Sequence, residues 1–225
     1  MDVTVVSPHL DDGVFSVGAS IRALSRTGHT VRVVTIFAND PGSSGPVGDW
    51  DRSCGFETRA EAALERRRED QRACELLGAD THWLPYPDSE NRSGVVRSEL
   101  AKTLRSSLSH GLVLTPMWPL THPDHLLTTE LVLATVRPRS RIVGYVEQPY
   151  ASLQLLAHIR GRSPHQVAFM GGEGYTIRTS AGDWLKKCQA VSQYQSQLRS
   201  LRPLPRARIL SYEALLGGET LRRID

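Results

Sequence analysis

The sequence has little of what marks several common protein classes. Its 225 residues include only three cysteines, which are far apart and form no Cys-x-x-Cys pair. A disulfide framework or a thiolate zinc site is therefore not expected, and a reducing cytoplasm is the expected location. No apolar run approaches the roughly 20 residues that a membrane-spanning helix needs. The N-terminus also lacks the basic and apolar regions of a signal peptide.

Charge of one sign is not concentrated anywhere in the chain. Lysine and arginine number 27 against 24 acidic residues, which gives a net charge of +3 and no long basic block. Nucleic acid is therefore not an expected partner. The length suits one sizeable domain better than two, so residues 1–225 are predicted to form a single domain, and a homo-oligomer is compatible with this composition.

Short β-type runs alternate with helical periodicity through most of the chain. This alternation predicts a Rossmann-like three-layer α/β sandwich with a mostly parallel sheet. Strands are expected at 3–6, 31–37, 82–84, 112–115 and 142–146, and helices at 14–24, 57–77, 95–108, 126–136 and 184–201. Residues 38–55 read as a long binding or lid loop, residues 150–183 as a turn-rich insertion, and the last residues as a polar tail.

Two motifs rich in histidine and aspartate follow two of these predicted strands. The first is Ser-Pro-His-Leu-Asp-Asp at 7–12, and the second is Thr-His-Pro-Asp-His at 121–125. The carboxyl ends of parallel strands border one crevice, which is the usual ligand site of an open α/β sheet. The glycines at 171–174 follow no strand–turn–helix unit, so they do not predict a dinucleotide site.

The spacing within the motifs makes a metal site available. His9 and Asp12 lie three residues apart at a strand-to-helix turn, and His125 shares a helix face with His122. Three protein ligands and an open position for water are what a hydrolytic Zn²⁺ or another divalent metal requires. With His9, Asp12 and His125 as ligands, Asp11 remains as a base and His122 as an oxyanion-stabilising acid.

Each motif taken alone has a simpler interpretation. The two aspartates could cap a helix and favour its dipole, and the His-Pro-Asp-His segment could be the start of a surface helix. Two such motifs at two predicted strand ends favour the metal site, because helix capping does not account for histidine at three of these positions.

The motifs resemble those of the PIG-L/LmbE-like family of zinc-dependent N-deacetylases. That family has an Ala/Pro-His-Pro-Asp-Asp-Glu motif after its first strand and a His-Pro-Asp-His-type motif later. The resemblance implies the metal ligands and catalytic pair given above, and it makes Asp124 an acid that orients a histidine. Two positions depart from the family pattern, Leu10 in place of proline and Gly13 in place of glutamate, and neither is a ligand position.

The resemblance also implies a reaction and a substrate class. The expected enzyme is a metal-dependent N-deacetylase that removes an N-acetyl or other N-acyl group from a small molecule containing an amino sugar. Alternatives are an amidase of thiol-sugar conjugates and an inactive metal-binding interaction protein. Arg66, Asp88 and Tyr150 are the candidates for substrate contacts, although Arg66 could instead pair with Glu69 on its own helix.

Overall fold

A computed structural model describes residues 1–89, 96–136, 140–159, 173–202, 206, 209–210, 213–214 and 217–224. Its centre is a seven-stranded sheet in the order β3-β2-β1-β4-β5-β7-β6. The first five of these strands are parallel to one another, and β7 and β6 add antiparallel pairings at one edge. The strands are β1 (Asp2–Ser7), β2 (Thr30–Thr35), β3 (Asp80–Trp83), β4 (Leu112–Trp118), β5 (Arg141–Val146), β6 (Gly174–Tyr175) and β7 (Leu221–Ile224).

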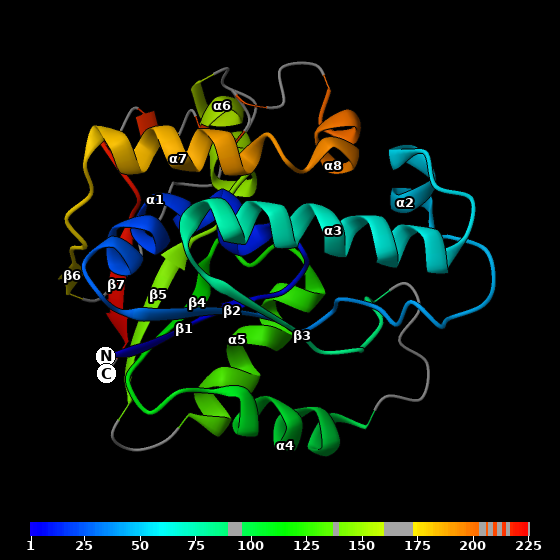
Figure 1. Ribbon diagram of the computed structural model, residues 1–225, viewed down its shortest axis with the longest axis horizontal. Coiled ribbons are helices and arrows are strands. Elements are labelled where there is room, and N and C mark those ends of the chain that lie inside the picture. Colours follow the sequence, from blue (N-terminus) through cyan, green and yellow to red (C-terminus); the bar gives the residue numbers. More distant parts are fainter. Residues whose placement is uncertain are drawn as a thin grey trace.

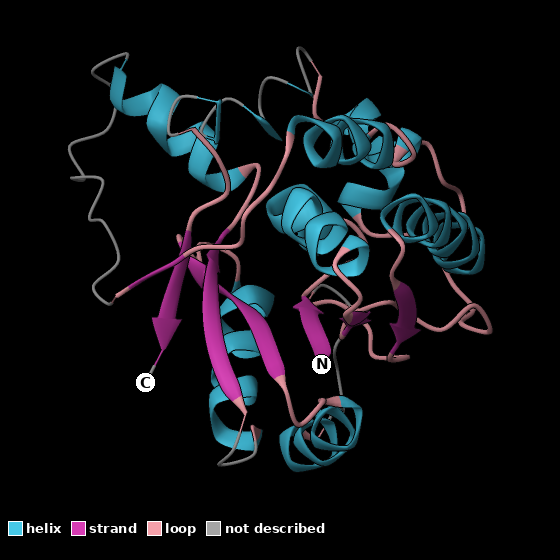
Figure 2. Ribbon diagram, turned by 60° about the vertical axis from the view of Figure 1, so that its left-hand side comes forward, coloured by secondary structure: helices cyan, strands magenta, loops and turns pink. Residues whose placement is uncertain are grey.

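Helices cover both faces of the sheet, as the sequence predicts. In Figure 1, α1, α3 and α7 lie above the strands, and α4 and α5 lie below them. Figure 2 shows the strands between these two helical layers. The helices are α1 (Asp12–Arg26), α2 (Asp49–Cys54), α3 (Arg59–Leu77), α4 (Arg97–Ser107), α5 (Pro123–Thr135), α6 (Tyr150–Ile159), α7 (Ala181–Val191) and α8 (Gln195–Ser200).

The apolar run of β1 explains why two cores form. Val3 and Val5 belong to the core shared with α1, α3 and α7, whereas Val6 belongs to the core shared with α4 and α5. Successive side chains of a strand point to opposite faces, so a strand covered on both faces must be apolar at nearly every position. Burying both faces fixes β1 at the centre of the sheet.

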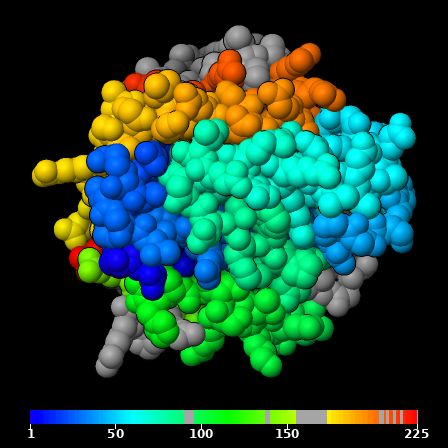
Figure 3. All heavy atoms as spheres, viewed as in Figure 1, coloured from blue at the N-terminus to red at the C-terminus, as the bar shows by residue number. Residues whose placement is uncertain are grey.

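The ends of helix α3 are set by local hydrogen bonding and backbone conformation. At the start of α3 the Thr58 side chain accepts a hydrogen bond from the Glu61 amide, 3.2 Å away. At its end Gly78 takes the left-handed conformation with φ 75°, which glycine adopts without a steric penalty. Figure 3 shows α3 crossing the front of the molecule with α7 and α8 directly above it.

Four predicted segments differ from the structure. The predicted loop at 38–55 contains the short helix α2, and the predicted helix at 184–201 is divided into α7 and α8. The expected polar tail includes β7, which pairs antiparallel with β5 through Leu221 and Ile224. The predicted insertion at 150–183 begins with α6, while its residues 160–172 lie outside the described part. Within the described residues, no helix is long and apolar enough to cross a bilayer.

Candidate metal and catalytic site

The two motifs meet where the strand order reverses. β1 lies between β2 and β4, so the turns that leave β1 and β4 at their carboxyl ends are neighbours. The first turn is held by Ser7, whose hydroxyl donates to the His9 carbonyl at 2.6 Å and accepts from the Gly13 amide at 2.8 Å. A Cβ atom at Gly13 would lie 3.2 Å from the Ser7 hydroxyl oxygen, so glycine there permits the close approach. Leu10 is buried in the interior.

Three side-chain atoms from the two motifs form a nearly equilateral triangle. The Asp12 Oδ2 atom is 3.2 Å from His9 Nδ1 and 3.2 Å from His125 Nε2, and the two nitrogens are 3.3 Å apart. Ligand atoms on a tetrahedral ion at 2.0–2.2 Å lie about 3.3–3.6 Å from one another. Two imidazoles and one carboxylate at this spacing are therefore a donor set that fits a divalent metal such as Zn²⁺.

His122 lies beside this triangle and enlarges the group of nitrogen donors. Ligand nitrogens of His9, His122 and His125 all lie within 4.8 Å of one another. The His122 and His9 rings meet edge to face with centroids 5.1 Å apart. The second motif thus contributes both of its histidines to the same place as the first motif.

A carboxylate holds the outer nitrogen of each histidine in the triangle. Asp124 Oδ2 lies 3.1 Å from His9 Nε2, and it also accepts from the Ser89 amide at 2.9 Å. His125 Nδ1 contacts Glu147 Oε1 in the same way. These contacts direct His9 Nδ1 and His125 Nε2 toward Asp12. Such outer hydrogen bonds fix the orientation and tautomer of metal-binding histidines.

The carboxylates also change how readily the two histidines accept protons. Burial disfavours the charged ring of His9, but its hydrogen bonds with Asp12 and Asp124 raise the pKa to about 9. The same competition, with Asp12 and Glu147 as partners, raises the pKa of His125 to about 10. The three carboxylates therefore favour the protonated form of both rings.

Asp11 lies beside the triangle, and its carboxylate does not cap helix α1. It occupies the position before the first residue of α1, yet within the described structure its side chain makes no capping hydrogen bond. Burial and the neighbouring charge of Asp12 raise the pKa of Asp11 to about 7, and the positive charge of Arg66 opposes this rise. A carboxyl with a pKa near neutrality is suited to accept and return a proton.

His122 is held in one hydrogen-bonding form. Its Nδ1 atom accepts from the Asp124 amide at 3.2 Å, so the residue caps α5. Burial and the nearby rings of His9 and His125 lower the pKa of His122. With Nδ1 accepting, the neutral ring carries its proton on Nε2, which can donate a hydrogen bond.

Arg66 reaches this region from α3. Its Nη1 atom donates to Asp51 Oδ1 at 3.1 Å, and its buried Nε has no hydrogen-bond partner among the described residues. The ion pair of Arg66 is with Asp51, whereas Glu69, the alternative partner, accepts from the amide and hydroxyl of Ser196. Burial lowers the pKa of the Arg66 guanidinium, but nearby carboxylates outweigh this and raise it. They belong to Asp51, Asp11 and Asp88.

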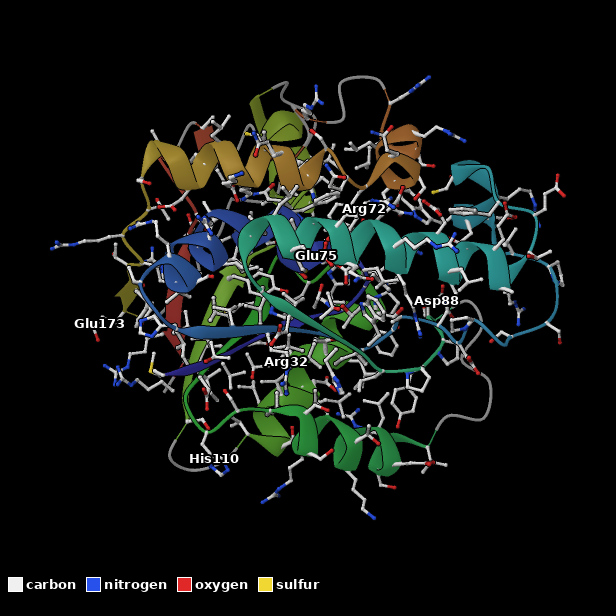
Figure 4. All side chains as sticks on the ribbon, in the orientation of Figure 1. Arg32, Arg72, Glu75, Asp88, His110 and Glu173 are labelled. Atoms are coloured by element: carbon white, nitrogen blue, oxygen red, sulfur yellow. The ribbon has the colours of Figure 1, made fainter. Side chains whose placement is uncertain are left out.

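The remaining candidates for substrate contacts lie on two further segments. Asp88 follows β3 in the loop below α3 (Figure 4). Tyr150 begins α6, and its ring meets that of His125 edge to face at a centroid distance of 5.1 Å. Burial and the surrounding carboxylates raise the pKa of the Tyr150 phenol, which therefore stays protonated. The glycines at 171–172 lie outside the described residues.

The comparisons with known proteins identify the family. The family model described as PIG-L, GlcNAc-PI de-N-acetylase, matches residues 4–136, which include both motifs. The chain belongs to the PIG-L family. No curated protein matches it in sequence.

Solved structures of PIG-L-type deacetylases resemble the chain over nearly its whole length. The A40926 pseudoaglycone deacetylase Dbv21 is 25% identical, with a TM-score of 0.80 over 98% of this chain and 95% of that one. The zinc-inhibited form of teicoplanin deacetylase Orf2 is 22% identical, with a TM-score of 0.81 over 100% and 99%. N,N'-diacetylchitobiose deacetylase from Pyrococcus horikoshii is 20% identical, with a TM-score of 0.60 over 99% and 83%. The last two likenesses concern the fold.

Proposed function

We propose that this chain is a metal-dependent N-deacetylase that removes an acetyl group from the amino sugar of a glycosylated small molecule. The observation that carries the proposal is the triangle of His9 Nδ1, Asp12 Oδ2 and His125 Nε2 at 3.2–3.3 Å, with Asp11 beside it. Membership of the PIG-L family supports the reaction. The likeness to the A40926 pseudoaglycone deacetylase supports an amino sugar on a larger aglycone as the substrate.

The metal ligands in this proposal are His9, Asp12 and His125, and Zn²⁺ or another divalent metal fits them. A divalent ion bound there supplies a Lewis acid that makes water more acidic and polarises a carbonyl group. His122 is assigned to the substrate and not to the metal, because it lies outside the triangle and its Nδ1 accepts from the Asp124 amide. Its Nε2 makes no hydrogen bond among the described residues and can serve the substrate.

The two remaining side chains divide the proton transfers. Asp11 takes a proton from the attacking water, since it is the carboxylate next to the proposed ligand Asp12 and makes no capping hydrogen bond of its own. His122 donates a hydrogen bond from Nε2 to the carbonyl oxygen as negative charge develops, and it then gives the Nε2 proton to the leaving amine. The proton that Asp11 took from water replaces it, so both groups return to their starting forms. The products are acetate and the free amino sugar.

Three polar groups are proposed to hold the sugar. Arg66 has a buried Nε without a partner among the described residues, and the charge of Asp88 lies near it. The protonated Tyr150 hydroxyl is a further hydrogen-bond donor beside His125. An amidase of thiol-sugar conjugates would use the same metal and proton-transfer groups. The two activities therefore differ in the group that is attached to the sugar in the substrate.

The proposal is tested with the Asp11→Asn variant. We expect full metal content and a loss of turnover on the order of 10²–10⁴-fold, because only the proton acceptor is removed. Acetate and free amine are measured with a panel of N-acetylated glycosides, and the bound metal is quantified in the same samples. Asp2→Asn, an exposed aspartate at the other end of β1, is the control and should retain activity. Unchanged turnover in Asp11→Asn would refute the assignment of the base, and no acetate release from any glycoside would favour an inactive metal-binding protein.

A further inference from the structure

Glu147 is a buried carboxylate that touches both parts of the second motif. It follows the last residue of β5 and has no solvent exposure. One carboxylate oxygen, Oε1, contacts His125 Nδ1, while the other, Oε2, accepts from the Leu120 amide at 2.8 Å. Its own amide donates to the Trp118 carbonyl at 2.7 Å. Glu147 therefore joins the end of β5 to the turn that leads out of β4.

The contact with His125 determines which ring nitrogen faces the first motif. The His125 side chain is fully buried, so a proton on Nδ1 needs an acceptor inside the protein. Glu147 is that acceptor, and it leaves Nε2 directed at Asp12 Oδ2, 3.2 Å away. Without the carboxylate, the ring would have no fixed tautomer and one of its nitrogens would be buried without a partner.

The contact with Leu120 acts on the segment that carries His122. Leu120 has a φ of 51°, a conformation that is unfavourable for residues other than glycine, asparagine or aspartate. It lies two residues before His122, so its backbone conformation sets the position from which the His122 side chain extends. A hydrogen bond from its amide to Glu147 Oε2 holds the turn in this conformation.

We propose that Glu147 is the positioning residue of the second motif. Its one carboxylate fixes both the tautomer of His125 and the turn that carries His122. The inference rests on the proposed metal site, in which His125 is a ligand. It adds a residue that lies outside both motifs, 22 residues from His125 in sequence.

The test replaces Glu147 by glutamine, which keeps the size of the side chain. In Glu147→Gln the carbonyl oxygen can accept from only one of the two donors. If it keeps the Leu120 amide, the NH2 group faces His125 Nδ1, which must then accept, so the ring proton moves to Nε2, where the metal would bind. We expect the dissociation constant for Zn²⁺ alone to rise by about 10–100-fold, measured by competition with a chromogenic chelator. Hydrogen exchange at the Leu120 amide should also become faster.

Glu69→Gln is the matched control. Glu69 is likewise buried and accepts one amide and one side-chain hydrogen bond, both from Ser196, at 2.8 and 2.6 Å. It should lower the melting temperature while the Zn²⁺ affinity stays unchanged. Equal Zn²⁺ affinity in wild type and folded Glu147→Gln would overturn the inference and leave the proposed function intact. A wild-type chain that binds no Zn²⁺ would overturn both.

A measurement on the wild-type chain does not depend on whether the variant folds. In the Zn²⁺-loaded protein, ¹⁵N NMR of the histidines should show the His125 proton on Nδ1 and none on Nε2. A His125 proton on Nε2 would contradict the role of Glu147. Loss of the Nδ1 proton signal in Glu147→Gln, but not in Glu69→Gln, would support it.

Discussion

Lys187 offers a prediction whose size follows from its surroundings. This α7 side chain is fully buried, and its Nζ lies 2.7 Å from Glu213 Oε2 and 2.7 Å from Glu219 Oε1. Glu219 in turn accepts from the amides of Ala19 and Ser20 at 2.8 Å each, in the part of α1 that follows the kink at Val17. The ammonium thus neutralises two buried carboxylates that tie the C-terminal segment to α1.

Lys187→Met removes the charge but keeps most of the aliphatic stem. Removing one partner of a buried ion pair costs about 3–5 kcal/mol, because the other charge stays buried without compensation. For a chain of this size that corresponds to a fall in melting temperature of about 6–20 °C. Urea unfolding at pH 8 gives the free energy directly, and Lys186→Met on the same helix is the control, with an expected change below about 0.5 kcal/mol.

The pH dependence provides an independent check on this reasoning. Burial raises the pKa of Glu213, with Lys187 opposing and Glu219 adding to the rise. A carboxyl whose folded pKa is raised contributes stability that is present below its unfolded pKa and is lost as the pH rises through the folded value. The defect of Lys187→Met should therefore shrink as the pH falls toward 4. A loss below about 1 kcal/mol at pH 8, or a loss independent of pH, would refute the role given to Lys187.

Three further predictions concern single side chains. Two hydrogen bonds from Arg26 lower the pKa of Asp183 to about 2, so its contribution to folding stability is present above pH 4 and is lost as the pH falls toward 2. Asp183→Asn should lower the free energy of unfolding in urea by about 1–2 kcal/mol at neutral pH and should flatten this acid dependence. An unchanged dependence of stability on acid pH would contradict this. His122→Ala should keep its metal and lose more activity on an amide than on an ester of similar shape, whereas equal losses would leave only the oxyanion role. Arg66→Lys should raise KM more than it lowers kcat, and a lower melting temperature with unchanged kinetics would make Arg66 structural.

The sequence predicts the parallel core and the meeting of the motifs because both depend on local signals. A run such as Val3–Val6, which is apolar except at Thr4, is expected when helices cover both faces of the strand. Strands of one direction bring their carboxyl ends to one edge, so residues that follow them lie together without any knowledge of the packing. The convergence of 7–12 and 121–125 follows from these two rules.

Structural features that depend on residues far away in the sequence cannot be predicted from such local signals. Leu221–Ile224 contains two arginines and forms a strand only through its pairing with β5. The break between α7 and α8 falls at Tyr194, whose hydroxyl donates to Asp70 at 2.7 Å, a partner 124 residues away. Glu147 follows the same pattern, since its role is set by contacts with the turn after β4 rather than by its own neighbours in sequence.

The most direct test of the account is the rate of acetate release as a function of bound metal. The wild-type chain is freed of metal by chelation and titrated with Zn²⁺, and acetate release from an N-acetylated glycoside is followed at each point. The account predicts no turnover without metal and a rise to a plateau at one ion per chain, with neither binding nor turnover at the same Zn²⁺ concentrations in His125→Ala. Turnover that survives chelation, or full metal occupancy in His125→Ala, would contradict it.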